Sequence, residues 1–162
     1  MRVERIDAAD FSLIWPLVQA AFSDARTYPY NPQADIEEAR GIWCSADKRT
    51  YAAWVNETVV GTCYIRPNQP CLGSHICNAG FIISPAHAGL GYGKALGGWA
   101  LEEAVRLGYE AMQFNWVVAD NKASLRIWDQ LGFQIVGTVP NAFKGLDDRY
   151  QDTLILYKAL VV

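Results

Sequence analysis

Several classes of protein are excluded by what this chain lacks. It has no run of apolar residues near the roughly 20 that a membrane-spanning helix needs, and residues 1–5 do not begin a signal-peptide core. Charged residues make up only 19% of the chain and the net charge is −3, so the basic face that nucleic acid requires is not expected. We therefore expect a soluble, cytoplasmic protein with neither a nucleic-acid nor a membrane partner.

The four cysteines lack the spacing of a metal site. No C-x-x-C pair occurs among them, so we expect reduced thiols and no bound metal; they are Cys44, Cys63, Cys71 and Cys77. Cys71 and Cys77 precede the motif described below, but no His–Cys signature accompanies them beyond His75. A buried strand thiol is the favoured interpretation, and no covalent intermediate is predicted.

What the chain does contain suits one folded unit. Its 162 residues are 51% hydrophobic, and a domain of this size buries about two-thirds of its unfolded surface. No repeat, low-complexity tract or linker divides it, so a single domain over residues 1–162 is expected. Strand-like runs that first pair as hairpins and then alternate with helices predict a mixed α/β sheet.

The expected elements follow from local signals. A first strand is expected over Val3–Ile6. Asp10 is expected to cap a helix that Pro16 kinks or splits. Asp35 and Glu38 have the spacing of a capping box for a second helix. A polar loop is expected over 140–152. The later elements are strands over 50–56, 59–65, 74–83, 111–118, 133–139 and 153–157, with helices over 91–107 and 122–131.

One glycine-rich turn carries most of the functional information. The run FIISPAHAGLGYGKAL, residues 81–96, leads an apolar strand through glycines 89, 91 and 93 into a helix. Such a turn lets the backbone approach a phosphate, which the helix N-terminus attracts. A P-loop would need Gly at position 88 and Ser or Thr at position 95, and both are Ala; a dinucleotide G-x-G-x-x-G fails at Lys94 and at Leu96.

The turn and a second block resemble the GNAT acetyltransferases. Gly91-x-Gly93 matches the second half of that family's [RQ]-x-x-G-x-[GA] motif, although position 88 is Ala. The block NKASLRIWDQLGF, residues 121–133, is similar to the family's N-x-x-[AS]-x-x-x-Y-x-x-x-G-F, and the resemblance covers roughly residues 50–158. It implies the acyl-coenzyme A N-acyltransferase fold, with about seven mostly antiparallel strands and four helices.

The resemblance also implies where acetyl-coenzyme A would bind as co-substrate. The pantetheine arm would pair with backbone groups of residues 81–83, and a backbone N–H near Ile83 would polarise the thioester oxygen. Amides of residues 90–95 would hold the pyrophosphate, with Lys94, Lys122 and Arg126 as nearby cations. The implied residues are Phe81, Ile82, Ile83, Leu90, Gly91, Tyr92, Gly93, Lys94, Ala95, Asn121, Ser124 and Trp128; Trp128 also fits plain helix core.

The usual acid and base of that family are missing. Residues 74–83 contain no carboxylate, and position 128 is Trp, whose indole N–H donates a hydrogen bond without acting as an acid. Asn78 and Asn115 instead lie in apolar strands, and Asn121 opens the second block. Either strand Asn has an alternative role in a structural hydrogen bond across a bulge, for which Gly80 gives support.

At four positions the chain resembles a narrower group, the fungal acetyltransferases that detoxify proline analogues such as azetidine-2-carboxylate, and their bacterial relatives. These positions are Asn78, Phe81, Asn115 and Asn121. This implies that Asn78, Asn115 and Phe81 hold a cyclic amino acid. It also implies that Asn121, with ordered water, replaces the usual acid. A catalytic role for His75 is the less favoured alternative.

Other interpretations stay open. Tyr28, Tyr30 and Asn68 fit ordinary loop surface slightly better than the roof of an acceptor pocket. The acceptor could be a different small amine or amino acid, and the chain could be a non-catalytic acyl-coenzyme A-binding module. Homodimers are common in the resembled family, but no interface can be read from the residues.

Overall fold

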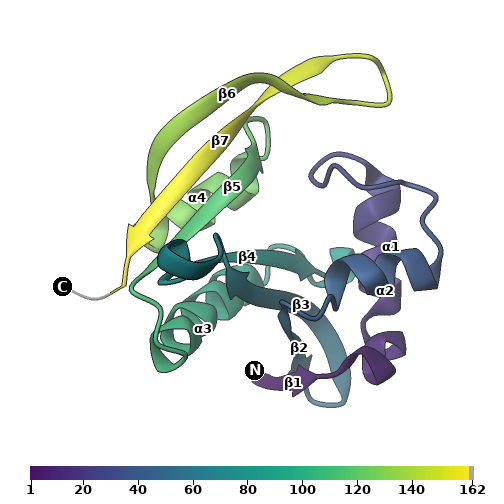
Figure 1. The fold of residues 1–162 in the computed structure, drawn as a ribbon. Helices are drawn as coiled ribbons and strands as arrows, with labels where there is room; N and C mark the ends of the chain where they lie inside the picture. The colour runs from purple at the N-terminus through teal and green to yellow at the C-terminus, as the bar shows by residue number, and fades with distance from the viewer. Residues whose placement is uncertain (161–162) are drawn as a thin grey trace.

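A computed structural model of the protein describes residues 1–160 and shows a seven-stranded sheet with helices on both faces (Figure 1). The strand order is β1-β2-β3-β4-β5-β7-β6, and the paired strands are antiparallel except for β4 and β5. The strands are β1 Arg2–Ile6, β2 Arg49–Val55, β3 Thr58–Pro67, β4 Ile76–Ile83, β5 Ala111–Val118, β6 Gln134–Lys144 and β7 Tyr150–Ala159. The expected mixed, mostly antiparallel sheet is therefore confirmed.

Two apolar cores lie against the sheet. One packs α1 and α2 on the side chains of Tyr64 and Ile82, and the other packs α3 and α4 on Cys77, Ala79 and their neighbours. The α-helices are α1 Trp15–Asp24, α2 Ile36–Trp43, α3 Tyr92–Arg106 and α4 Lys122–Gln130, with a short 3-10 helix, Ala8–Leu13, before α1. Within the described residues, no helix is long and apolar enough to cross a bilayer.

The first helical segment is split, as Pro16 predicted, but Asp10 does not cap it. Asp10 lies inside the 3-10 helix, and Ile14 occupies the N-cap position of α1 with Pro16 in the first turn. Pro is favourable there because its missing N–H would have no helical partner. The Asp35 prediction is confirmed, since its Oδ1 accepts from the Glu38 N–H at 2.8 Å. The Glu38 side chain instead bonds Asn31, so the capping box is only half formed.

Gly80 does not mark a bulge. Residues 77–83 pair with β3 in unbroken register, and Gly80 lies opposite Tyr64. A Cβ on Gly80 would lie 2.5 Å from the Tyr64 ring, so glycine is required for that ring to lie flat on β4. The bulge occurs on β5 instead, where the register with β7 shifts between Phe114 and Val117.

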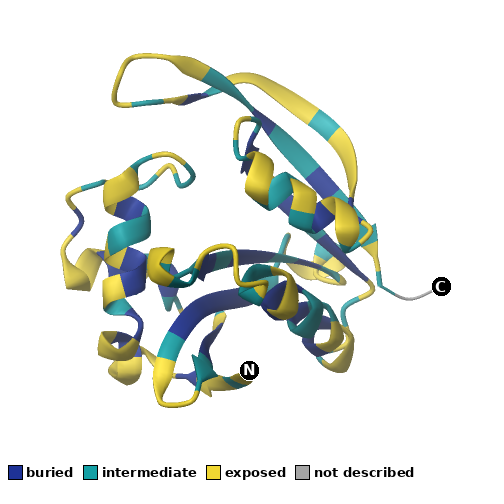
Figure 2. Ribbon diagram, turned by 180° about the vertical axis from the view of Figure 1, so that it is seen from behind, coloured by how far each residue is buried: buried dark blue, intermediate teal, exposed yellow. Residues whose placement is uncertain are grey.

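The predicted loop over 140–152 is mostly strand. β6 and β7 pair out to Lys144 opposite Tyr150, and a tight turn joins them, with the Gly145 N–H bonded to the Arg149 carbonyl at 2.9 Å. Figure 2 shows this outer hairpin largely exposed. Its polar residues are compatible with strand because solvent covers much of it and cross-strand pairing supplies the backbone bonds.

A buried carboxylate on α3 allows a stability prediction. Glu103 accepts hydrogen bonds from the Tyr51 hydroxyl at 2.8 Å and from Arg106 at 2.6 and 2.7 Å. Arg106 holds the pKa of Glu103 below its usual value, so this contribution exists above the unfolded pKa and is lost as pH falls through the folded pKa. We expect Glu103→Gln to lower the free energy of unfolding by about 1–2 kcal/mol at pH 7.

Urea titrations of the wild type and Glu103→Gln at pH 7 and pH 3 measure this effect. The difference between the two proteins should narrow at pH 3. Glu102→Gln, on the exposed side of the same turn, serves as the control and should change stability little at either pH. A difference for Glu103 that does not depend on pH would contradict the assignment.

Candidate functional site

The candidate site is a cavity of about 750 Å³ where β4 and β5 diverge. These strands pair only at Ile76–Ala111 and Cys77–Met112, and residues 78–83 of β4 and 114–118 of β5 border the cavity. The turn at the N-terminus of α3 contributes Gly93, and α4 contributes Ser124 among others. The parallel strands thus open a groove that runs from the glycine turn toward β3.

A cluster of carboxamides lies in the region between β3, β4 and β5. Asn68 Oδ1 accepts from Asn115 Nδ2 at 2.7 Å and from Asn78 Nδ2 at 3.4 Å. Gln113 Nε2 donates to Asn115 Oδ1 at 2.8 Å. The structure therefore brings together the two strand Asn residues singled out from the sequence, through Asn68, which the sequence left as loop surface.

Alternation along β4 and β5 explains how the two strand Asn residues reach this cluster. On β5, Asn115 shares a face with Gln113, because Met112 and Phe114 point to the other face and join the core. The register with β7 shifts only after Phe114. Asn78 lies on the face of β4 that also carries Gly80 and Ile82. The Phe81 ring lies on the other face, 4.8 Å from Trp128 and 6.0 Å from Phe114 between ring centroids.

Tyr28 makes the most direct contact with the open edge of β4. Its hydroxyl accepts from the Phe81 N–H at 3.0 Å and donates to the Phe81 carbonyl at 2.8 Å. Burial raises the pKa of Tyr28 well above its ordinary value, so the phenol is neutral. Tyr28 and Tyr30 both line the cavity, which corrects their interpretation as ordinary loop surface.

Backbone alternation decides which β4 groups face the cavity. The Ser84 N–H donates to Val60 of β3, whereas Phe81 bonds Tyr28. Because backbone groups of successive strand residues point to opposite edges, Ile83 faces the same edge as Phe81, and Ile82 faces β3. Ile82 therefore presents its side chain, and not its backbone groups, to the cavity.

The glycine turn has the backbone shape that glycine permits. Gly89 and Gly91 have φ values of +78° and +85°, and Gly91 is the N-cap of α3, which begins at Tyr92. A Cβ on Gly93 would touch Ile127 of α4 at 3.0 Å, so Gly93 also allows close helix packing. The residues expected at the pyrophosphate lie in this turn and in the first turn of α3, and of the six only Gly93 lines the cavity; they are Leu90, Gly91, Tyr92, Gly93, Lys94 and Ala95.

The second block forms the first turns of α4. Asn121 is its N-cap, with Oδ1 accepting from the Ser124 N–H at 3.2 Å. Ser124 Oγ accepts from Trp128 Nε1 at 2.7 Å, and the Trp128 ring packs among Phe114 and Phe133 in the core. Trp128 therefore serves the helix core and also lines the cavity, and its contact with coenzyme A stays a prediction.

The thiols and His75 offer no nucleophile or base at the site. Burial raises the pKa of Cys77 to about 12 and that of Cys63 further, so both are neutral. Cys71 is exposed in the β3–β4 loop, and His75 is exposed just before β4. Neither Cys71 nor His75 is among the described residues that line the cavity.

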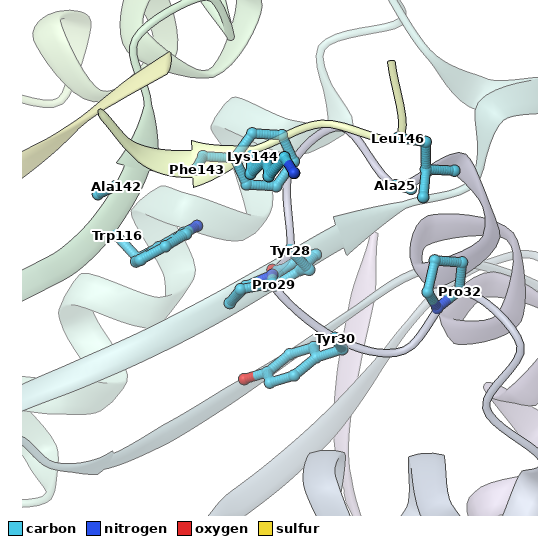
Figure 3. Close-up of a pocket in the computed structure, with 10 residues that line it drawn as sticks. All are labelled: Ala25, Tyr28, Pro29, Tyr30, Pro32, Trp116, Ala142, Phe143, Lys144 and Leu146. Atoms are coloured by element: carbon cyan, nitrogen blue, oxygen red, sulfur yellow. The ribbon is translucent and has the colours of Figure 1, made fainter. Parts of the chain in front are cut away.

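A smaller cavity of about 240 Å³ adjoins the first, with Tyr28, Pro29, Tyr30 and Trp116 lining both. Figure 3 shows the loop between α1 and α2 facing Trp116 of β5 and Phe143 and Lys144 of β6. Two segments remote in the sequence, the 25–32 loop and the tip of the β6–β7 hairpin, thus close this end of the site.

Comparison with known proteins gives consistent matches. The model of the acetyltransferase (GNAT) family matches residues 15–133. N-acetyltransferase aca1 of Schizosaccharomyces pombe is 41% identical over 85 residues; these are 52% of this chain and 41% of that protein, so the chain matches less than half the length of this curated relative.

Solved structures match over nearly the whole described chain. A GCN5-related N-acetyltransferase from Kribbella flavida is 33% identical, with a TM-score of 0.89 over 98% of this chain and 96% of that one. A phosphinothricin acetyltransferase from Sinorhizobium meliloti, solved in complex with AcCoA, is 20% identical, with a TM-score of 0.83 over 99% and 88% of the two chains. At 20% identity, the second likeness concerns the fold alone.

Proposed function

Because this chain belongs to the GNAT acetyltransferase family, we propose that it transfers the acetyl group of acetyl-coenzyme A to the amine of a small molecule, by direct attack in a ternary complex. One observation carries the proposal. The cavity between β4 and β5 runs from the glycine turn of α3 to the carboxamides of Asn78 and Asn115. A phosphate-binding end and a polar end in one groove suit a co-substrate and an acceptor that meet.

The β4 edge supports the placement of acetyl-coenzyme A. The amides of residues 90–95 at the α3 N-terminus would hold the pyrophosphate, and the backbone groups of Phe81 and Ile83 would pair with the pantetheine arm. Since Tyr28 bonds both backbone groups of Phe81, the arm can pair there only if the Tyr28 hydroxyl moves. Binding of acetyl-coenzyme A is thus coupled to the loop that closes the acceptor end.

Proton transfer is left to the amine and to water. The amine nitrogen attacks the thioester carbon, the C–S bond breaks, and the proton lost by nitrogen reaches the thiolate of coenzyme A. Among the described residues that line the cavity, Asp24 is the one carboxylate, and it lies at the C-terminal end of α1. An Asn takes up no proton near pH 7, so the neutral fraction of the amine would attack, and positioning would supply much of the rate.

The acceptor we favour is a small cyclic amino acid of the proline-analogue type. Support comes from the shared Asn78–Asn68–Asn115 cluster, whose amides can orient a secondary amine, and from aromatic walls at Tyr28, Tyr30 and Trp116. Asn121 would contribute through its amide nitrogen, because its Oδ1 already caps α4.

Release of coenzyme A, followed with a thiol reagent, tests the function. Acetyl-coenzyme A is offered with azetidine-2-carboxylate, hydroxyprolines, ordinary amino acids and simple amines. Turnover on the cyclic amino acids supports the full proposal, and turnover only on other amines keeps the acetyltransferase and discards this acceptor. Tight acetyl-coenzyme A binding without turnover on any amine would instead indicate a binding module.

A further inference from the structure

Arg66 lies beside the carboxamide cluster, on the face of the sheet that carries Asn78. The two residues are direct partners across β3 and β4. Side chains of directly opposed residues share a face, with Cβ atoms about 4.5–5.5 Å apart. Tyr64, two residues earlier on β3, is on the same face. Arg66, Asn78 and Tyr64 all line the large cavity, so the guanidinium belongs to its acceptor end.

Part of the guanidinium is left without a partner. Arg66 Nη1 donates to Asp47 Oδ2 at 3.0 Å, an ion pair with a half-exposed carboxylate. The Nε–H is buried and has no hydrogen-bond partner among residues 1–160. A buried N–H without an acceptor is costly, and a guanidinium offers its donors in a fork that fits a carboxylate. The unpaired donors therefore fit an anion in the cavity, toward which the partly exposed side chain would turn its buried Nε–H.

The surroundings favour a negative ligand as well. Arg66 is the one cation among the described residues that line the cavity. Lys48 lies next to it, with Nζ 4.3 Å from the centroid of the Tyr64 ring. Burial and the charge of Arg66 lower the pKa of Lys48 to about 8. Lys48 and Asp47 do not line the cavity, but around Arg66 the side chains thus carry two cations against one carboxylate, although the chain has a net charge of −3.

We propose that Arg66 binds the carboxylate of the acceptor, which makes the enzyme selective for amines that carry a carboxylate on the neighbouring carbon. This rests on the acetyltransferase function proposed above. An amino acid whose carboxylate meets Arg66 has its nitrogen one carbon away, on the side of Asn78 and Asn115. Lys144, at the smaller cavity, is the weaker competitor because Asp148 already pairs with it at 2.7 Å.

Paired substrates and paired variants test the proposal. The wild type, Arg66→Gln and Arg66→Lys are assayed with azetidine-2-carboxylate and with its neutral isostere azetidine-2-carboxamide, or with the best carboxylate acceptor of the panel and its amide. We expect Arg66→Gln to raise KM for the carboxylate by about 10- to 30-fold, the loss of one charge-assisted interaction, and to leave KM for the amide unchanged. For the carboxylate, the KM of Arg66→Lys should lie between those of the wild type and Arg66→Gln. The KM of Lys144→Gln should match that of the wild type.

Arg49→Gln is the matched control. Arg49 pairs with Ile65, the neighbour of Arg66 on β3, so its side chain lies on the other face of the sheet. Arg49→Gln therefore removes the same charge at the same end of the sheet, but away from the cavity. Thermal melts check that each variant folds. The proposal is overturned if Arg66→Gln alters both substrates equally or neither, or if the wild type does not prefer the carboxylate. If the wild type acetylates no amine at all, the proposed function fails first, and the role of Arg66 fails with it.

Discussion

Asn115→Ala should lower kcat/KM for the acceptor by about 100-fold, because two hydrogen bonds that orient the amine site are lost together. The Asn115 amide donates to Asn68 at 2.7 Å, and its oxygen accepts from Gln113 at 2.8 Å. Without them Asn78 keeps only the 3.4 Å bond to Asn68. Steady-state kinetics with a saturating concentration of acetyl-coenzyme A measure the loss, and its dissociation constant should not change.

Two further variants separate chemistry from structure. Asn115→Asp keeps the size of the side chain and its acceptor but cannot donate to Asn68 when ionised, so it should show most of the loss. Asn68→Ala combined with Asn115→Ala should cost less than the sum of the two single changes, because they share one bond. Gln19→Ala removes an exposed carboxamide from α1 as a control. Activity of Asn115→Ala within threefold of the wild type would show that the cluster only supports the fold.

Gly91→Val should weaken acetyl-coenzyme A binding by about 100-fold, because a β-branched residue is strongly disfavoured at a φ of +85°. A Cβ at this position meets no neighbour within 4 Å, so the expected defect comes from the backbone conformation. When the turn relaxes to a negative φ, the amides at the start of α3 no longer converge on the pyrophosphate. Calorimetric titration with acetyl-coenzyme A gives the dissociation constant.

Gly41→Val is the matched substitution for that experiment. Gly41 lies in α2 and needs no positive φ, and a Cβ added there meets no atom within 4 Å, so acetyl-coenzyme A binding should stay as in the wild type. Comparable thermal melts for the two variants would assign the effect at Gly91 to the binding turn. Unchanged affinity in Gly91→Val would mean that the pyrophosphate is held elsewhere.

Much of the fold could be predicted from local sequence. The strand over 111–118 has the same bounds in the structure, and the helices expected over 91–107 and 122–131 differ by a residue at their ends. Their signals are short-range: apolar periodicity and a glycine turn before α3. The Asn121 cap of α4 was not predicted and was found in the structure. The 140–152 segment was missed because its pairing partner, and not its composition, makes it a strand.

The site was predictable only in part, for a similar reason. Asn78 and Asn115 stand out because carboxamides are rare in apolar strands, and the structure joins them through Asn68. Nothing local distinguishes Tyr28 or Arg66 from ordinary loop and strand-end residues. Tyr28 reaches Phe81 across 53 positions, and Arg66 reaches the cavity because β3 and β4 pair in one register.

The sequence by itself determined the family, the glycine turn before α3 and the two strand carboxamides, since each depends on residues a few positions apart. Only the tertiary structure decided which backbone groups of β4 are free, where the bulge falls and which side chains close the acceptor end. Those features depend on strand register and on loops that meet from distant parts of the chain. A change of one residue in register turns a side chain to the other face of the sheet, so no local pattern can specify them.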